Sequence, residues 1–307
     1  MKVQQLAIAR KRHAPESHKL APMKMKSLLL TTSICTLAVQ AVTAAESNWQ
    51  HQAISPVVNP IFFESPLIQS EVRPLFAYHR FDKNFLGVDA YARVYAVQLR
   101  YAVNDRLAII ATKDGYMEIR PKGGKSMHGW NDIGAGLKYA VYRDDEQQLQ
   151  ITPGLTFELH NGDDEVFQGN GAGEFNVFVS AIKGFGKFHV TANLGARVPI
   201  DFDEETANFR TALQLDYYTC RYFIPFVTLN TVTTLSEGEG LAAKTEGFDV
   251  VNFGSQDAAG RTQLAAGLGF RSRLHERVDI GLAYEYGFSP DNDIFKDRIT
   301  ADLIFRF

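Results

Sequence analysis

The feature that most constrains this chain is a strict alternation of apolar and polar side chains along residues 71–307. Between Phe188 and Val198, apolar side chains fill every second position, and polar residues such as His189 and Arg197 stand between them. Successive side chains of a β-strand point to opposite faces, so a period of two predicts a strand with one apolar and one polar face. About twelve such runs lie near 71–81, 90–103, 105–115, 130–142, 148–160, 174–183, 187–200, 207–218, 221–234, 261–272, 276–288 and 296–307.

The connections between these runs alternate in length. Short turns lie at 104–105, 143–147, 184–186, 219–220 and 274–275, whereas long connections cover 82–89, 116–129, 161–173, 201–206, 235–260 and 289–295. Short turns at one end and long loops at the other are typical of bacterial outer-membrane β-barrels, which have even strand numbers. Because the first connection is long, both termini are expected at the periplasmic end.

The polar faces carry many ionisable side chains, and this decides between a dry and a wet interior. A dry core would bury each charge at a cost of several kcal/mol, whereas a wet lumen surrounded by lipid avoids that cost. We therefore predict an all-β fold, a closed antiparallel transmembrane β-barrel of about twelve strands with periplasmic termini (residues 71–307). A soluble sheet with one wet face is the alternative. The predicted lumen-lining residues are Arg100, Asp114, Lys138, Glu158, His189, Arg197, Arg210, Asp216, Arg271, Asp279, Glu285, Arg298, Asp302 and Arg306.

Glycines share these polar faces with the charged residues. Because glycine has no side chain, glycines on the inner wall are expected to keep space open in the lumen. The glycines assigned to this face are Gly134, Gly136, Gly154, Gly195, Gly267, Gly269 and Gly281.

The first 45 residues have the pattern of an export signal. Lys24 and Lys26 precede an apolar run from Leu28 to about Val42, and small residues follow. This order predicts a leader and signal peptide over residues 1–45 that is removed on export. Residues 46–70 lie outside the alternation and contain three prolines, so we expect either a periplasmic segment or a short plug in the lumen.

Charge and cysteine content exclude several classes of protein. Removing 1–45 takes seven of the 32 Lys and Arg residues and one of the 35 Asp and Glu residues, which leaves a net charge of about −9. A nucleic-acid partner needs a basic surface and is not expected. Only Cys220 remains, so no intrachain disulfide can form. No cofactor is predicted, and no metal site, because the acidic clusters fall in long connections.

The last residues, ITADLIFRF, place Phe305 and the terminal Phe307 on one apolar face. This segment resembles the C-terminal strand of bacterial outer-membrane barrels, and the resemblance implies that Phe305 and Phe307 form the signal read by the barrel-assembly machinery. Tyrosines near the ends of the predicted strands fit the aromatic girdles of such barrels at the two lipid–water interfaces. These tyrosines are Tyr91, Tyr101, Tyr139, Tyr142, Tyr217, Tyr218, Tyr284 and Tyr286.

The stretch from Trp130 to Tyr139, WNDIGAGLKY, resembles a G-D-[IL]-x-[LA]-G-x-K-Y strand found in a broad group of porin-like outer-membrane proteins. That group is often labelled as transporters of the meta-pathway for phenol degradation. The resemblance consists of the general strand pattern of the barrel and of one strand whose residues match the motif. It implies a channel or uptake role and transfers no individual site residue.

The leading functional prediction is an outer-membrane channel or transporter for passive passage of small solutes through the lumen. The alternatives are a lipid-modifying outer-membrane enzyme and a non-conducting structural or adhesive barrel. An acyl hydrolase needs a serine activated by a nearby histidine. None of the histidines after the signal is followed two residues later by serine, so no enzyme is expected. Expected partners are outer-membrane lipid and lipopolysaccharide, the assembly machinery and a small solute.

Overall fold

The computed structural model describes residues 49–83, 87, 89–289 and 293–307, so the predicted leader and signal peptide lie outside the described residues. Fifteen strand segments and two 3-10 turns make up the regular structure. Their bounds are η2 (Trp49–His51), β1 (Glu71–Phe81), β2 (Ala90–Ala102), β3 (Leu107–Lys113), β4 (Tyr116–Pro121), β5 (Met127–Trp130), β6 (Gly134–Tyr139), β7 (Tyr142–Asp144), β8 (Leu149–Glu158), η3 (Asp164–Val166), β9 (Glu174–Phe185), β10 (Phe188–Pro199), β11 (Asn208–Tyr217), β12 (Ile224–Thr234), β13 (Thr262–His275), β14 (Val278–Gly287) and β15 (Phe295–Arg306).

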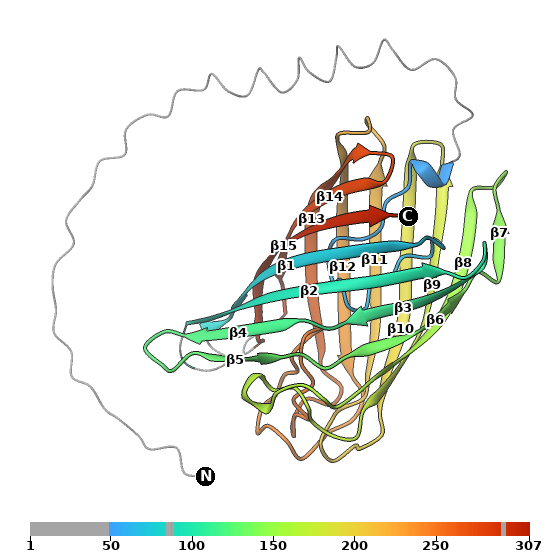
Figure 1. Ribbon diagram of the computed structural model, residues 1–307. Helices are drawn as coiled ribbons and strands as arrows, with labels where there is room; N and C mark the ends of the chain where they lie inside the picture. The colour runs from blue at the N-terminus through green and yellow to red at the C-terminus, as the bar shows by residue number, and fades with distance from the viewer. Residues whose placement is uncertain (1–48, 84–86, 88, 290–292) are drawn as a thin grey trace, which may run out of the picture. The chain divides into compact units, whose positions relative to one another are not determined.

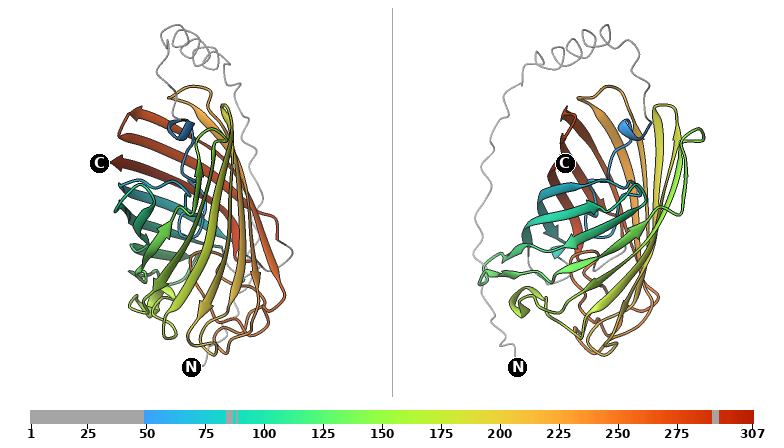
Figure 2. Two further views of the ribbon diagram at one scale, coloured as in Figure 1. Left: turned by 90° about the vertical axis from the view of Figure 1, so that its right-hand side faces the viewer. Right: turned by 45° about the vertical axis from the view of Figure 1, so that its right-hand side comes forward.

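These segments form one antiparallel sheet that closes on itself (Figures 1 and 2). The first strand, β1, pairs with both β2 and β15, with Val72 opposite Leu99 on one side and Phe305 on the other. Closure leaves no open edge, which lipid could not satisfy with hydrogen bonds. The predicted closed antiparallel barrel of twelve strands is confirmed.

Two of the twelve wall strands are interrupted. β3 pairs with one end of β2 and β4 pairs with the other end, so β3 and β4 follow each other along the same wall position. In the same way β5, β6 and β7 follow each other, with β5 on β4, β6 on β3 and β7 on β8. Counting each interrupted set once gives the twelve strands.

The predicted long connection 116–129 is wrong, because most of it is strand. β4 and β5 extend two wall strands as a hairpin, and only residues 122–126 connect them. The register slips just before this hairpin, between Ala111 and Lys113. The slip places both Thr112 and Lys113 in buried positions, so a strict count of two fails there. Asp114, predicted to line the lumen, is half-buried: it lines a cavity inside the barrel and accepts a hydrogen bond from the Val97 amide, at 3.0 Å.

The apolar face of the barrel points outward, as the alternation predicts. Leu268 is 60% exposed although it belongs to an apolar strand face, whereas Arg271 on the opposite face is fully buried. Most of the tyrosines near the strand ends are also exposed on the outer surface, as expected of an aromatic girdle. An outer wall of leucine, valine and phenylalanine is stable against lipid and would be costly in water.

The short turns gather at one end of the barrel, and the C-terminus and η2 lie at that same end (Figure 1). The turn between β9 and β10 has only two residues, Gly186 and Lys187, and Gly186 adopts a φ of 67°, which glycine accepts without strain. In the described part of the chain, no helix has the length and hydropathy of a membrane span.

Candidate functional site: the lumen and its two inserted segments

The first inserted segment comprises residues 49–70, which run inside the barrel between its walls (Figures 1 and 2). We call this stretch the N-terminal segment. Its side chains are among the most buried of the protein: Ile54, Val57, Val58 and Phe63 are each at most 1% exposed. The segment has an irregular backbone, since prolines at 56, 60 and 66 prevent it from joining the sheet. Its backbone carbonyls therefore need partners from the wall.

Wall cations supply those partners. Lys138 donates to Glu64 Oε1 at 2.7 Å and to the carbonyls of Ser65 at 2.7 Å and Leu67 at 2.8 Å. Arg100 binds the same Glu64 carboxylate through two nitrogens, at 2.9 and 2.6 Å. Two predicted lumen-lining cations thus hold the Glu64 carboxylate of the N-terminal segment. Nearer the start of this segment, Arg271 donates to the Ser55 carbonyl at 3.1 Å.

The second inserted segment is the connection between β12 and β13, residues 235–261, which we call the inserted loop. Phe248, Val251 and Phe253 are buried against the lumen side of the wall. Inside the loop, the Glu246 carboxylate accepts hydrogen bonds from the amides of Phe253 at 2.8 Å and Ser255 at 2.7 Å. The loop is therefore held in one conformation by hydrogen bonds within it and by its packing against the wall.

Polar side chains on both sides anchor the inserted loop to the wall, and Gln263 of β13 donates to the Glu246 carbonyl at 2.9 Å. Asp249 Oδ1 accepts from Arg298 Nη1 at 2.8 Å, and Arg298 also binds Glu285 at 2.8 Å. Asn252 donates to Glu174 Oε2 at 3.2 Å. These contacts are buried, so each replaces interactions that the same groups would otherwise make with water.

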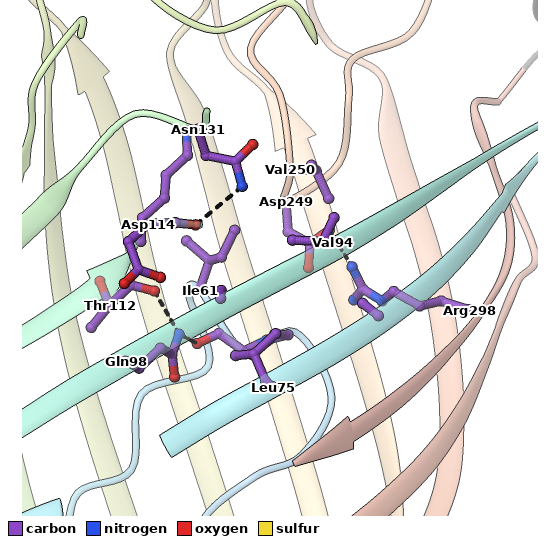
Figure 3. A pocket seen from close by; sticks show the side chains of 14 residues that line it. Ile61, Leu75, Val94, Gln98, Thr112, Asp114, Asn131, Asp249, Val250 and Arg298 are labelled. Carbon is purple, nitrogen blue, oxygen red and sulfur yellow. Dashed lines mark hydrogen bonds and ion pairs between the residues drawn. The ribbon is translucent and has the colours of Figure 1, made fainter. Parts of the chain in front are cut away.

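The two inserted segments approach each other near the middle of the lumen. Figure 3 shows the small cavity left there, with Ile61 of the N-terminal segment on one side and Asp249 and Val250 of the inserted loop near Arg298 on the other. Its volume is about 30 Å³, and Gln98 and Leu75 of the wall also line it. A volume of this size holds about one water molecule. The two inserted segments thus leave little open space between them at this point.

The predicted lumen-lining residues are buried, apart from Asp114 and Arg306, which are partly exposed, and most form ion pairs with groups of opposite charge. Arg73 and Arg271 converge on Asp302, at 2.5 and 2.9 Å. Lys113 and Arg197 meet Glu158 and Glu174. The remaining pairs are Arg100 with Glu64 and Glu71, Lys138 with Glu64, Arg298 with Asp249 and Glu285, and Arg273 and Arg306 with Asp279. His189 Nδ1 lies within hydrogen-bonding distance of Asp216 Oδ1, at 2.9 Å.

Arg210 differs from the other lumen arginines because it has no carboxylate partner among the described residues. Its guanidinium lies 3.5 Å from the centre of the Phe62 ring, and Arg197 lies over the same ring at 5.3 Å. Its Nη2 donates to Asn176, while Nε and Nη1 have no partner in the described part of the chain. Phe62 of the N-terminal segment is thus held between two cations, an arrangement that attracts through the negative face of the ring.

The inner-face glycines do not keep the lumen open. A Cβ on Gly281 would lie 2.8 Å from Val57, and one on Gly267 would lie 3.1 Å from Val58. These two glycines make room for the N-terminal segment. At Gly154, the space is filled by the ring of Phe178. The prediction of empty space at these positions is corrected: the absence of a side chain lets other parts of the chain approach.

One apolar cavity lies between the inserted loop and the wall near the long-loop end. Its volume is about 70 Å³, and it is lined mainly by apolar side chains of β1, β2, β4 and the loop, among them Met117, Ile119 and Val251. His79 is its polar lining residue. The imidazole is 2% exposed, packs edge-on against Phe295 at 4.7 Å, and neither ring nitrogen has a partner among the described residues.

Sequence reasoning missed the residues that pair with the predicted set. Glu64 and Asp249 lie in inserted segments, where no alternation assigns a side chain to the lumen. Lys113 was missed because of the register slip, and Arg73 because its strand has the weakest alternation. Glu174 is different, because it begins a strongly alternating run and the alternation assigns it to the inner face.

The described residues contain no group of three or more His, Cys, Asp or Glu side chains arranged to hold a metal ion. Geometry and wall chemistry together define the class of protein: a twelve-stranded β-barrel of the outer-membrane type, with apolar residues outside and charged residues inside.

No family model matches this chain, and no curated protein matches it. Among solved structures, it is similar to the crystal structure of an outer-membrane channel from Pseudomonas putida, with a TM-score of 0.58 and 11% identity over 83% of this chain and 100% of that chain. The NanC porin (TM-score 0.48, 10% identity, 78% of this chain, 100% of that chain) and the translocator domain of the autotransporter NalP from Neisseria meningitidis (0.47, 13%, 90%, 98%) are also found. At 11% identity, the likeness to the Pseudomonas putida channel shows the fold alone.

Proposed function

We propose that this protein is a gated outer-membrane channel for small solutes. The observation that carries the proposal is that a charged, twelve-stranded lumen is filled by two separate segments of the chain rather than by wall side chains. About eight strands enclose an interior that side chains can fill, and twelve enclose a wider one. A lumen of this width that is occupied by a loop is consistent with a channel that opens when the loop moves. The similar channel from Pseudomonas putida supports the same assignment at the level of the fold.

The inserted loop is the better candidate for the moving part. It is anchored by the pair Asp249–Arg298 and by Asn252 with Glu174. Further hydrogen bonds reach the loop from Gln263 of β13 and from Gln168 and Thr206, which lie in neighbouring long connections. The N-terminal segment, by contrast, is held along its whole length by Lys138, Arg100 and Arg271 and by its buried apolar side chains. Several anchors of the loop lie in neighbouring long connections rather than in wall strands, so we infer that the loop opens first.

The apolar cavity beside the loop is the natural first binding place for the solute. It lies between the loop and the wall, on the path from the long-loop end to the constriction. Its volume of about 70 Å³ fits only a fragment of a solute while the loop is closed. Binding there favours the open position, since a ligand shifts an equilibrium toward the state that binds it better.

A non-conducting barrel is the second candidate, and the pairing of most described lumen charges favours it. Ion pairs between wall and inserted segments cross-link the lumen, and such cross-links serve stability equally well. A lipid-modifying enzyme is not favoured by any observation.

Conductance in planar bilayers separates the two candidates. The intact chain is compared with a variant that lacks residues 241–257 of the inserted loop. The matched control lacks residues 122–125, which connect β4 and β5 and stay outside the lumen. For a gated channel, we expect brief, rare openings of the intact protein and long, larger openings of the loop variant, with the control like the intact protein.

If neither the intact protein nor the loop variant conducts, and neither admits solutes into liposomes, the channel proposal fails and the structural barrel takes its place. Lipid hydrolysis in the same vesicles would instead favour the enzyme. Folding of each variant is checked by its migration on a gel before and after heating.

A further inference from the structure

The outward faces of neighbouring strands change character in the same order toward the long-loop end. On β1, the outward side chains are Val72, Pro74 and Phe76, followed by Tyr78 and then Arg80. On β2, apolar residues and Tyr95 are followed by Arg93 and then Tyr91. On β4, Tyr116 is followed by Glu118 and then Arg120. The register places these residues side by side, with Arg80 opposite Tyr91 and Tyr91 opposite Arg120.

This order matches the depth profile of a bilayer. Apolar residues face the hydrocarbon, tyrosines lie at the interface, and the arginines stand where lipid headgroups begin. Arg80 pairs with Asp297 at 2.5 Å but remains about half exposed, and Arg93 and Arg120 share Glu118, at 3.8 and 3.1 Å. Neither arrangement removes the guanidinium groups from the surface.

A hollow of about 600 Å³ lies on this part of the outer surface. Its lining includes four cationic side chains, Arg80, Arg120, Lys122 and Lys296, and a single acidic one, Asp89. Arg80, Arg120 and Lys122 each have a carboxylate partner, Lys122 in Asp89 at 3.8 Å, yet their side chains stay at least 43% exposed. These accessible cations contrast with the net charge of about −9 expected for the chain after residue 45, from 25 basic and 34 acidic side chains. Tyr78 and Tyr91, stacked at 5.1 Å, form its apolar side.

We propose that this hollow, the basic hollow, binds a phosphate group of the lipid in the outer leaflet, as carried by the phosphorylated glucosamine headgroup of lipopolysaccharide. Arginine and lysine side chains form charge-assisted hydrogen bonds with phosphate, and arginine can do so through two nitrogens. The stacked tyrosines contact the sugar and the start of the acyl chains. A lipid is favoured over a free anion because the hollow continues directly into the lipid-facing apolar surface.

The proposal does not depend on whether the lumen conducts. The test uses the intact protein in detergent, with binding of bisphosphorylated lipid A measured by native mass spectrometry. The variant carries R120Q, K122Q and K296Q, which leave the Arg80–Asp297 pair intact. The control carries R106Q, K187Q and R277Q, three exposed basic residues at the short-turn end, and therefore loses the same charge.

We expect the variant to bind lipid A at least tenfold more weakly than the intact protein and the control. Dephosphorylated lipid A should bind the intact protein as weakly as lipid A binds the variant. Equal binding of the phosphorylated and dephosphorylated lipids would overturn the proposal, and so would an equal loss in the control. Binding of inorganic phosphate without any preference for the lipid would also overturn it. All three proteins must show the heat-dependent gel shift of a folded barrel.

Discussion

Lys138 shows how a single lumen side chain can serve two roles at once. Its ammonium group is fully buried, yet all of its described hydrogen bonds go to the N-terminal segment and none to another wall strand. A buried charge is tolerated only when its partners replace water. The same contacts that satisfy Lys138 therefore fix the position of residues 64–67 in the lumen.

Replacing Lys138 by methionine should destabilise the folded barrel by about 3 kcal/mol, because Glu64 and two carbonyls lose their buried donor. The measurement is the midpoint of urea-induced unfolding in detergent. Lys187→Met, at an exposed turn position, should change the midpoint little. A Lys138→Met protein as stable as the parent would show that the N-terminal segment is not held by this contact.

Glu205 adds a pH-sensitive group outside the strands, between β10 and β11. Burial, together with the nearby Glu174 charge, raises the pKa of Glu205 to about 8 from 4.5. The folded state then holds a proton that the unfolded state has lost. Stability should fall as the pH rises from about 4.5 to about 8 and should level off above that.

The adjacent Thr206 donates its amide to Asn252 of the inserted loop at 3.0 Å, so ionised Glu205 should also loosen the loop. We expect more channel openings at pH 9 than at pH 6. Glu205→Gln should abolish most of this difference, whereas Glu237→Gln, at an exposed loop position, should preserve it. An unchanged pH response in Glu205→Gln would assign the effect to another group.

At the scale of elements, β15 joins the end of the chain to its beginning. It pairs with β1 and β14 along its length, and the Phe307 amide donates to the Ser70 carbonyl at 3.2 Å, where the N-terminal segment leaves the lumen. Phe307 is 68% exposed on the outer surface. An exposed terminal aromatic contributes little to packing, which leaves recognition during assembly as its predicted role.

Deleting Phe307 should lower the amount of assembled barrel in the outer membrane several-fold, whereas Phe307→Tyr should lower it little. The reason is that tyrosine retains the terminal ring. Quantification of the heat-modifiable band in membrane fractions gives the result, with total protein measured in parallel. Equal assembly of the two variants would remove the role of the terminal ring.

At the scale of the whole molecule, closure explains why the described barrel needs no disulfide. The wall strands have hydrogen-bonded neighbours on both sides except at β5, which pairs with β4 alone, and at β7, which pairs with β8 alone, and the inserted segments add buried apolar clusters and ion pairs inside. Unfolding therefore requires the closed sheet and the two inserted segments to lose their contacts together. Such barrels resist detergent until heated.

The unheated protein should thus migrate differently from the boiled protein on a gel with sodium dodecyl sulfate. A variant in which Leu268, on the lipid face, becomes arginine should show less of the folded band, because a charge near the middle of the bilayer costs about 2–4 kcal/mol. The same substitution at Leu274, which is exposed at the short-turn end of β13, serves as a control. Identical mobility before and after heating would contradict a closed barrel.

The sequence by itself determined the wall. A period of two is a local property of the strand backbone, so the number of strands is predictable from the sequence. The apolar face must point outward because apolar side chains tolerate lipid, and the sheet must close because lipid cannot satisfy an open edge. The outward position of Leu268 was therefore predictable. The sequence failed where the period breaks: at the slip near Lys113, and in the β4–β5 hairpin.

Only the tertiary structure decided what fills the lumen. Residues 49–70 and 235–261 have no regular period, so their positions depend on distant partners such as Lys138 for Glu64 and Arg298 for Asp249. These pairs join residues 74 and 49 positions apart. The wall strands can be predicted from residues that are close in sequence. The positions of the two inserted segments depend on contacts that exist only once the barrel has closed.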